Sequence, residues 1–289
     1  MTSFDPKNLP TNILHGYLLS AVAPRPIAFA STVDEHGKPN LSPFSFFNVF
    51  SSNPPILVFS PSRRVRDNSV KHTLVNAEAT KEVVINVVNY DIVQQMSLSS
   101  TEYPEGVNEF EKSGLTMLKS DLVKPFRVAE SPVQFECKVN DIIKLGTEGG
   151  AGNLIICEVV KFHISKDVLD KDNSINQKKL DLVARAGGNF YSRANKGFFE
   201  VPKPLSALGI GVDNLPEEVR NSMVLTGNDL GMLANVKALP SKKMVNEFIK
   251  NLGENHPNIK NVSHREKHKL ARNYLSFGDV ESAWKILLS

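Results

Sequence analysis

The chain has 289 residues, of which 41% are hydrophobic and 22% charged, enough to bury one large domain with an attachment or two modest domains. Its 34 basic and 31 acidic residues leave a net charge of +3, which argues against a broad nucleic-acid-binding surface. The amino-terminal residues have no apolar run of signal-peptide length, no run reaches membrane-spanning length, and two cysteines give no disulfide framework. We therefore expect a cytoplasmic protein that contacts neither nucleic acid nor membrane.

The first predicted elements form a hairpin that leads into a segment rich in phenylalanine and serine. Residues 24–33 are typical of a strand entered through a proline-fixed extended segment, and residues 34–40 form the turn. The next run, 41–55, reads LSPFSFFNVFSSNPP. Phenylalanines alone would indicate a core strand, but hydroxyl and amide groups at this density favour a flat, polar-edged ligand along an exposed strand edge. On such a strand Ser45 and Phe47 share one face, and Phe44 and Phe46 the other.

Cations and hydroxyls gather in the loop that follows the apolar strand 56–60, just before an amphipathic helix predicted over 74–82. They are Ser62, Arg63, Arg64, Arg66, Lys71, His72 and Thr73. The amino end of a helix offers free N–H groups and a partial positive charge, which favours a phosphate. A solvated basic loop and a nucleic-acid contact are the alternative interpretations of such an arginine run.

Further strands are predicted over 83–89, 134–145 and 154–164, giving an antiparallel sheet of six or more strands that can curl into a barrel. Short helices are predicted over 90–99 and 104–113. The glycines at 149, 150 and 152 precede a strand, whereas a dinucleotide-binding motif follows a strand and opens a helix. We interpret them as a hairpin turn, and the sequence shows no Rossmann unit.

Three residues on the predicted strands carry reactive side chains. His163 lies on an apolar strand, where a lone histidine is usually a core or edge residue with one hydrogen bond. Cys137 and Cys157 lie in strand patterns without a partner at metal-ligand spacing. We expect two buried free thiols and no metal site.

The sequence pattern changes beyond Pro204, where Gly, Asn and Pro residues separate segments with the pattern of amphipathic helices. The helices are predicted over 217–225, 241–252, 264–277 and 280–288. Residues 270–275, with Gly278 and Ala283, are typical of one helical-repeat unit. Because one unit cannot bury its own face, we expect a helical hairpin packed on the barrel or on a second subunit.

Taken in chain order over residues 12–204, these segments resemble the flavin reductase-like, FMN-binding split-barrel family. The matching segments are PRPIAFAST (24–32), NLSPFSFFN (40–48) with Pro54-Pro55, KHTL (71–74), CEVVKFHI (157–164) and VARAGGNFY (183–191). The chain has Lys71-His72-Thr73 where many relatives have Lys-Asp-Thr, and Arg185-Ala186-Gly187-Gly188 where they have Arg-Leu-Gly-Gly.

The resemblance implies a mainly β fold with α elements, an antiparallel split barrel of Greek-key type with inserted helices, over residues 1–204. An α-helical extension over 205–289 follows it. The implied cofactor is FMN. Its ring edge would contact Ser45, Phe46, Phe47, Asn48, Val49, Phe50 and Ser51, and its ribityl phosphate would lie among Ser60, Ser62, Arg64, Lys71, His72 and Thr73. His163, Arg185 and Gly187 are further candidates near the flavin.

The implied function is an NAD(P)H-dependent flavin reductase, with NAD(P)H and free flavin as substrates and a homodimer as the assembly. Hydride passes between stacked nicotinamide and flavin rings, so we assign no general acid or base. Two alternatives use the same flavin cradle. One is an electron-transfer flavoprotein of the flavoredoxin type, and the other is a non-catalytic FMN-binding protein whose helical tail docks a partner.

Overall fold

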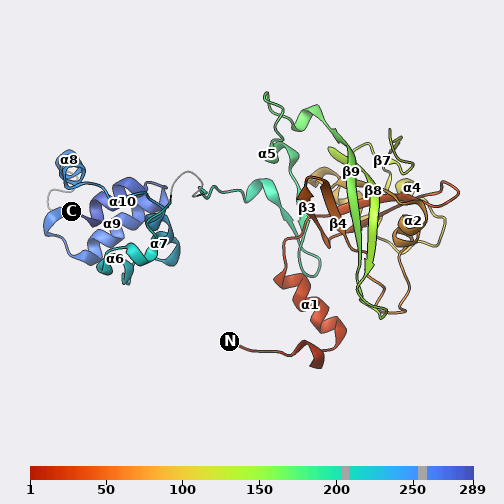
Figure 1. Cartoon of the computed structure of the whole chain (residues 1–289), viewed down its shortest axis with the longest axis horizontal. Coiled ribbons are helices and arrows are strands. Elements are labelled where there is room, and N and C mark those ends of the chain that lie inside the picture. The colour runs from red at the N-terminus through yellow and green to blue at the C-terminus, as the bar shows by residue number, and fades with distance from the viewer. Residues whose placement is uncertain (204–207, 253–258) are drawn as a thin grey trace. The chain divides into compact units, whose positions relative to one another are not determined.

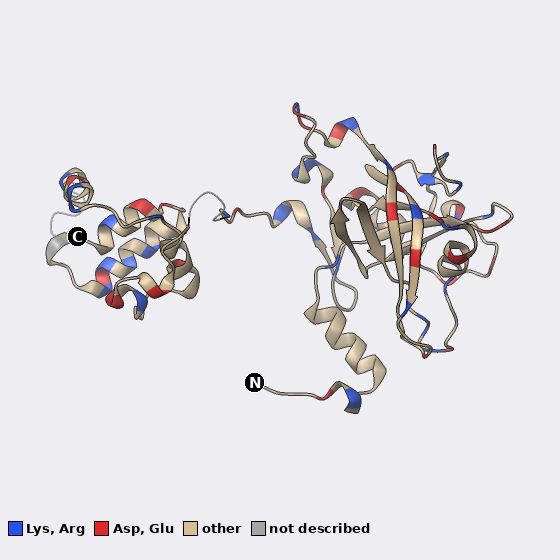
Figure 2. Cartoon of the chain, in the orientation of Figure 1, with Lys and Arg blue, Asp and Glu red and all other residues tan. Residues whose placement is uncertain are grey.

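The computed structural model describes residues 1–203, 208–252 and 259–289, and the chain divides into two compact units, Met1–Phe199 and Glu200–Ser289 (Figure 1). The domain boundary expected at 204/205 lies outside the described residues. Lys and Arg are interspersed with Asp and Glu in each unit (Figure 2). Within the described ranges, no helix is long and apolar enough to cross a membrane.

The first unit is built on one antiparallel sheet of seven strands in the order β2-β1-β5-β8-β9-β4-β3. The strands are β1 (Ala28–Val33), β2 (Pro39–Phe44), β3 (Phe47–Ser52), β4 (Pro55–Phe59), β5 (Glu82–Val87), β8 (Val133–Lys144) and β9 (Asn153–Ile164). The glycine-rich segment before Asn153 connects β8 to β9 as a hairpin turn, as predicted. Together with the C-terminal helices, this sheet confirms the predicted fold class.

The sheet curls because its two outermost strands are consecutive in the chain. Only Ser45 and Phe46 separate the end of β2 from the start of β3, although five strands lie between them in the sheet order. A connection this short brings the two edges together and makes the sheet a barrel split at this point. We call Ser45 and Phe46 the seam. The prediction that Phe44 and Phe46 share one face of a strand is therefore wrong: Phe44 is buried against Phe59, whereas Phe46 is exposed.

Two apolar clusters hold the barrel. The interior cluster contains alternate residues of the strands, such as Ala28 and Ala30, and also Leu74 of α2 (His72–Thr80). The outer cluster packs Phe29 and Leu41 beneath α3 (Val93–Leu98) and α4 (Glu109–Ser113), which contribute Met96 and Phe110. Strand β1 is buried along its whole length because both of its faces are covered. Cys137 and Cys157 are buried and free, as predicted, and burial raises the pKa of the Cys157 thiol to about 12.

Smaller elements complete the first unit. They are α1 (Thr11–Ala21), the 3-10 turns Pro6–Asn8, Tyr90–Ile92, Lys166–Val168 and Ala194–Lys196, the hairpin β6 (Met117–Leu118) with β7 (Arg127–Val128), α5 (Gln177–Leu180), and the hairpin β10 (Val183–Arg185) with β11 (Tyr191–Arg193). Helix α1 was not predicted from the sequence. The helix predicted over 74–82 begins two residues earlier at His72, and only the last turn of the helix predicted over 104–113 forms.

The second unit is helical and has its own core. Its elements are the 3-10 turns Val212–Asn214 and Ile259–Asn261 and the helices α6 (Glu217–Arg220), α7 (Gly227–Ala234), α8 (Lys242–Leu252), α9 (His264–Ser276) and α10 (Val280–Leu287). Trp284 is buried among these helices, and its indole N–H donates to the Leu233 carbonyl at 3.0 Å. The predicted repeat segment packs on the other helices of this unit, and α7, which was not predicted, adds Leu233 and Ala234 to the shared core.

Candidate functional site

Two neighbouring cavities in the first unit share Ser100 as a lining residue. The larger one, which we call the ring cavity, has a volume of about 550 Å³. It is lined by Ile27, Pro43, Ser45, Gln94, Met96, Ser97, Ser100, Arg185, Asn189 and Tyr191. The smaller one, the cationic pocket, has a volume of about 20 Å³ and also includes Ser100. Its other lining residues are Asn40, Ser42, Arg64, Lys71, His72, Thr73, Ser99, Thr101, Glu102, Tyr103 and Glu109.

The ring cavity lies where the seam, α3 and the β10–β11 hairpin come together. The Arg185 guanidinium stacks on the Tyr191 ring with 4.7 Å to its centroid, which fixes a planar cationic wall. Arg25 is buried behind the seam, where its Nε donates to Ser45 Oγ at 3.3 Å. Burial, and then the nearby charge of Arg185, lower the pKa of Arg25. No described carboxylate lies within ion-pair distance of either arginine, so this side of the cavity is electropositive.

The cationic pocket lies at the amino end of α2. Lys71 is the N-cap residue of α2, and no side chain caps this end of the helix. An uncapped helix end leaves N–H groups and a partial positive charge for an anion. The Arg64 guanidinium is held beside it by hydrogen bonds to Ser69 Oγ at 2.8 Å and to the Val70 carbonyl at 3.0 Å. Burial, and then the charge of Arg64, lower the pKa of the Lys71 ammonium.

Two carboxylates also border the cationic pocket. Glu109 is buried and accepts the Leu41 N–H at 3.0 Å, which attaches α4 to β2. Burial raises the pKa of Glu109, so its negative charge is disfavoured next to this pocket. Glu102 is half-exposed and accepts from Arg64 and Arg66, and these hydrogen bonds lower its pKa.

The structure brings together part of the candidate set. Ser45 and Arg185 line the ring cavity, and Arg64, Lys71, His72 and Thr73 line the cationic pocket. Gly187 lies in the β10–β11 turn, where a Cβ atom would overlap the Ser20 hydroxyl oxygen of α1. This glycine permits the turn to approach the helix closely.

The remaining strand candidates lie elsewhere in the single chain. Phe46, Phe47, Asn48, Val49, Phe50 and Ser51 line neither cavity, and strand β3 is an edge of the sheet. Ser60 is buried, and its hydroxyl accepts the Asn153 N–H at 3.0 Å, so it ties β4 to β9. Ser62 also lines neither cavity.

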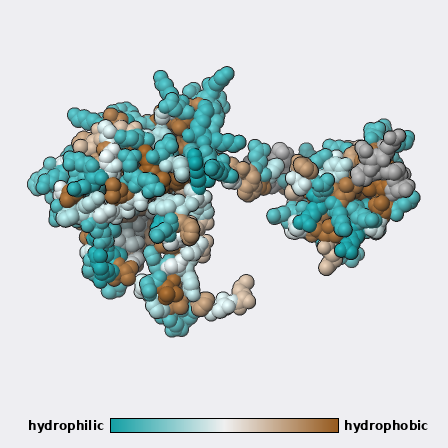
Figure 3. Space-filling view, turned by 180° about the vertical axis from the view of Figure 1, so that it is seen from behind, coloured by the Kyte–Doolittle hydropathy of each residue, from teal (hydrophilic) through white to brown (hydrophobic). Residues whose placement is uncertain are grey.

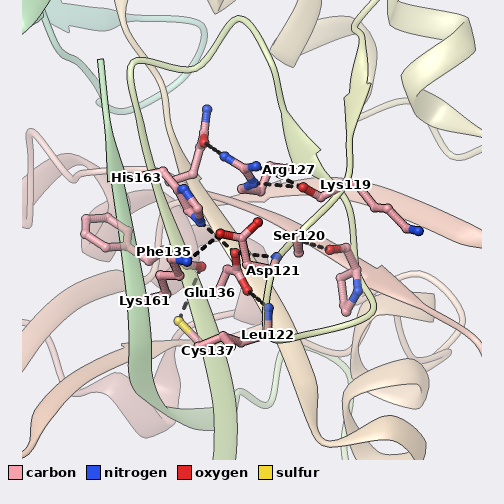
Figure 4. Close-up of polar contacts among 12 residues, drawn as sticks. Lys119, Ser120, Asp121, Leu122, Arg127, Phe135, Glu136, Cys137, Lys161 and His163 are labelled. Carbon is pink, nitrogen blue, oxygen red and sulfur yellow. Dashed lines mark hydrogen bonds and ion pairs between the residues drawn. The ribbon is translucent and has the colours of Figure 1, made fainter. Parts of the chain in front are cut away.

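His163 lies apart from both cavities, in a polar network between β8, β9 and the loop 119–124 (Figure 4). Its Nε2 is 2.6 Å from Glu136 Oε1, and the fully buried Glu136 also accepts the main-chain N–H groups of Asp121 and Leu122. One ligand atom each from Asp121, Glu136 and His163 lie within 4.8 Å of one another. The Lys161 ammonium already pairs with Asp121, and the Glu136 oxygens already have donors, so this network serves to fasten the loop to the sheet.

Sequence reasoning missed the residues that α3 and the segment after it contribute. Gln94, Ser97 and Ser100 line the ring cavity, and Thr101 and Glu102 line the cationic pocket. The run Ser97-Leu98-Ser99-Ser100-Thr101 was a usable signal, because it places four hydroxyl groups, each a donor and an acceptor, at the end of a short helix. No comparable sequence pattern marks Asn189 and Tyr191, which line the cavity because the β10–β11 hairpin places them there.

A family model described as flavin reductase like domain matches residues 20–187, more than half of the chain. The chain belongs to the flavin reductase-like family. An uncharacterised protein of Aquifex aeolicus is 37% identical over 191 residues, which cover 66% of this chain and 95% of that protein. The uncharacterised protein YwrF of Bacillus subtilis is 31% identical over 201 residues, covering 68% of this chain and 97% of YwrF. The helical second unit, which begins at Glu200, lies beyond the family match.

Solved structures show the same fold. Component B of nitrilotriacetate monooxygenase from Bacillus cereus is 28% identical with a TM-score of 0.65, and the match covers 70% of this chain and 98% of that one. A split-barrel-domain protein from Shewanella frigidimarina, at 24% identity, a TM-score of 0.59 and coverage of 70% and 100%, is similar in fold. The predicted family and split-barrel fold are confirmed. The family and these neighbours support a flavin-binding oxidoreductase.

Proposed function

We propose that the chain is an NAD(P)H-dependent flavin reductase that binds FMN across the ring cavity and the cationic pocket. The observation that carries the proposal is that the two cavities are neighbours and share Ser100 as a lining residue. One of them is roomy and has a planar cationic wall, and the other lies at an uncapped helix end among Arg64 and Lys71. A ligand with a flat ring at one end and a phosphate at the other matches this pair.

The donor set fits FMN better than it fits riboflavin. Lys71 and Arg64 would bind the phosphate by charge-assisted hydrogen bonds, together with the first N–H groups of α2. The hydroxyl of Thr73 is buried and accepts from Asn40 Nδ2 at 2.9 Å, so it fixes the floor of the pocket. Ser45 and Arg185 would hold the ring at the opposite end.

When bound, FMN supplies a ring that accepts hydride from a nicotinamide at van der Waals distance, about 3 to 3.5 Å. The chain's own residues would bind the FMN and orient its ring. Ile27 and Met96 give the ring cavity an apolar wall, and Ser45 offers a hydroxyl at the seam. The positive charges of Arg25 and Arg185 favour a ring that gains negative charge on reduction. This arrangement needs no general acid or base.

We also propose a homodimer in which a second copy covers the exposed apolar side of the barrel. None of the residues of α1 is buried, and its Ile13, Tyr17 and Leu18 are exposed. Figure 3 shows hydrophobic patches among hydrophilic ones on the surface of the first unit. On the edge strand β3, Val49 and Phe50 are 61% and 68% exposed. Surfaces of this kind mark interfaces. The candidates at 46–51 would then lie beside a flavin near the interface.

The experiment that tests the proposed activity is anaerobic mixing of the FMN-loaded protein with NADH and, separately, with NADPH. We expect at least one of them to bleach the visible absorbance of the flavin. Free FMN or oxygen should then restore the colour over many cycles. If the flavin stays oxidised with both nucleotides and is reduced by a protein donor, the electron-transfer interpretation replaces the reductase one.

A further inference from the structure

The cationic pocket already holds an anion, and that anion belongs to the chain. Glu102 lies in the loop between α3 and α4 and converges with three cations. Its Oε1 is 3.0 Å from Arg64 Nε and 3.9 Å from Lys71 Nζ, and its Oε2 is 2.8 Å from a terminal nitrogen of Arg66. Two carboxylate oxygens thus accept from two guanidinium groups in the way that two oxygens of a phosphate would.

The enclosed space left in the cationic pocket is small. Its volume is about 20 Å³, which is enough for about one water molecule. A phosphate that bonds to Arg64, Arg66 and Lys71 needs the positions that the two Glu102 oxygens occupy. Arg64 is anchored by Ser69 and Val70, and Thr73 by Asn40, so these two residues stay in place. Glu102 is the residue that can leave, because its side chain is 43% exposed and the only partners that the structure describes for it are the three cations.

We infer that Glu102 is an internal competitor that occupies the phosphate site and exchanges with the phosphate of the flavin nucleotide. This inference rests on the proposed function for the identity of the ligand, although the exchange itself requires only a phosphate group. The carboxylate neutralises the cations while the site is free, and it swings out to solvent when a phosphate replaces it. Affinity for FMN is therefore lower than the three cations alone would give, which favours release of the nucleotide.

A different role for Glu102 would reverse the direction in which its substitution changes phosphate affinity. If Glu102 served to organise Arg64, Arg66 and Lys71 for a phosphate that binds beside it, its removal would weaken phosphate binding. The structure argues against this role for Arg64, because Ser69 and Val70 hold that guanidinium without help from Glu102. The sign of a single substitution therefore decides between the two arrangements.

The test compares the full-length, flavin-free protein with Glu102→Gln. Glu105→Gln is the matched control, since Glu105 is an exposed carboxylate in the same loop that borders a neighbouring cavity and has no described cation partner. FMN, riboflavin and inorganic phosphate are titrated in parallel at one ionic strength. We expect Glu102→Gln to tighten FMN and phosphate about tenfold, the combined effect of several partly exposed ion pairs, and to leave riboflavin unchanged. Glu105→Gln should change FMN binding less than about twofold.

Three results would overturn the inference: weaker FMN and phosphate binding by Glu102→Gln, unchanged binding of both, or an equal gain for riboflavin. Thermal melting of both variants checks that the fold is kept, which the exposure of both side chains leads us to expect. The phosphate titration separates the inference from the proposed function. Tighter phosphate binding by Glu102→Gln in a protein that takes up no flavin would support the competitor and reject FMN as the ligand.

Discussion

Lys71 provides the most direct measure of how much the cationic pocket contributes to nucleotide binding. Its ammonium lies at the N-cap of α2, where a phosphate would also meet the N–H groups of the first turn. Its side chain is 28% exposed, so solvent weakens its interactions only in part. We expect Lys71→Ala to weaken FMN binding and to leave riboflavin binding nearly unchanged, because only FMN carries the phosphate.

The magnitude follows from the geometry of the pocket. A hydrogen bond between charged groups contributes about 1.5 to 3 kcal/mol, and partial exposure places Lys71 at the lower end of this range. Arg64 and Arg66 remain in the variant, so binding is not abolished. A loss of about 1.4 kcal/mol of binding free energy corresponds to a tenfold larger dissociation constant for FMN.

The assay is titration of flavin-free protein with FMN and with riboflavin, followed by the change in flavin fluorescence. Lys81→Ala is the matched control, because Lys81 is an exposed lysine at the opposite end of the same helix. It should bind both flavins as the unchanged protein does. Equal weakening of FMN and riboflavin by Lys71→Ala, or an unchanged FMN affinity, would show that the phosphate does not bind at this pocket.

Three further outcomes follow from the same geometry. The pKa of Lys71 lies below its ordinary 10.5, so the preference for FMN over riboflavin should hold at neutral pH and fall as the pH rises through that lowered pKa. Because arginine keeps its charge, Lys71→Arg should move this fall to higher pH. Titrations of both flavins across the alkaline range measure the change. Gly187→Ala should destabilise the first unit by about 1 to 3 kcal/mol, because the new Cβ meets Ser20, and adding Ser20→Ala should recover part of the melting temperature. Residues 1–199 alone should bind FMN as the full chain does, because no described residue that lines either cavity lies beyond this unit; a soluble fragment without FMN binding would contradict this.

Much of the barrel was predictable because its strands alternate and its turns carry Gly, Pro and Asn. The limits of β8 and β9 were predicted to within one residue, and the basic loop before α2 indicated an anion site from side-chain chemistry alone. Helix α1 was not predictable in this way, because its sequence TNILHGYLLSA has apolar residues on several faces and no capping side chain, so it has no clear helical period.

The residues that the sequence could not assign to the site are those that tertiary contacts bring there. Tyr191 faces the ring cavity because the β10–β11 hairpin pairs with Arg25 through two main-chain hydrogen bonds between Arg25 and Arg185, at 2.8 and 2.9 Å. Glu102 reaches Arg64 across 38 positions of sequence. Pairings over such distances depend on topology, whereas sequence patterns report only on neighbours along the chain.

The seam explains why a single short segment marks both the closure of the barrel and the proposed ligand site. At Ser45 and Phe46 the chain passes from one edge of the sheet to the other, so the strand ladder is interrupted and main-chain groups there need other partners. The Ser60 N–H donates to the Phe46 carbonyl at 2.8 Å, and Arg25 donates to Ser45 Oγ. A small polar residue at position 45 leaves space between the edges, and that space is part of the ring cavity. The phenylalanines on either side then have separate tasks: Phe44 fills the interior, and Phe50 stays at the surface where we expect the second subunit.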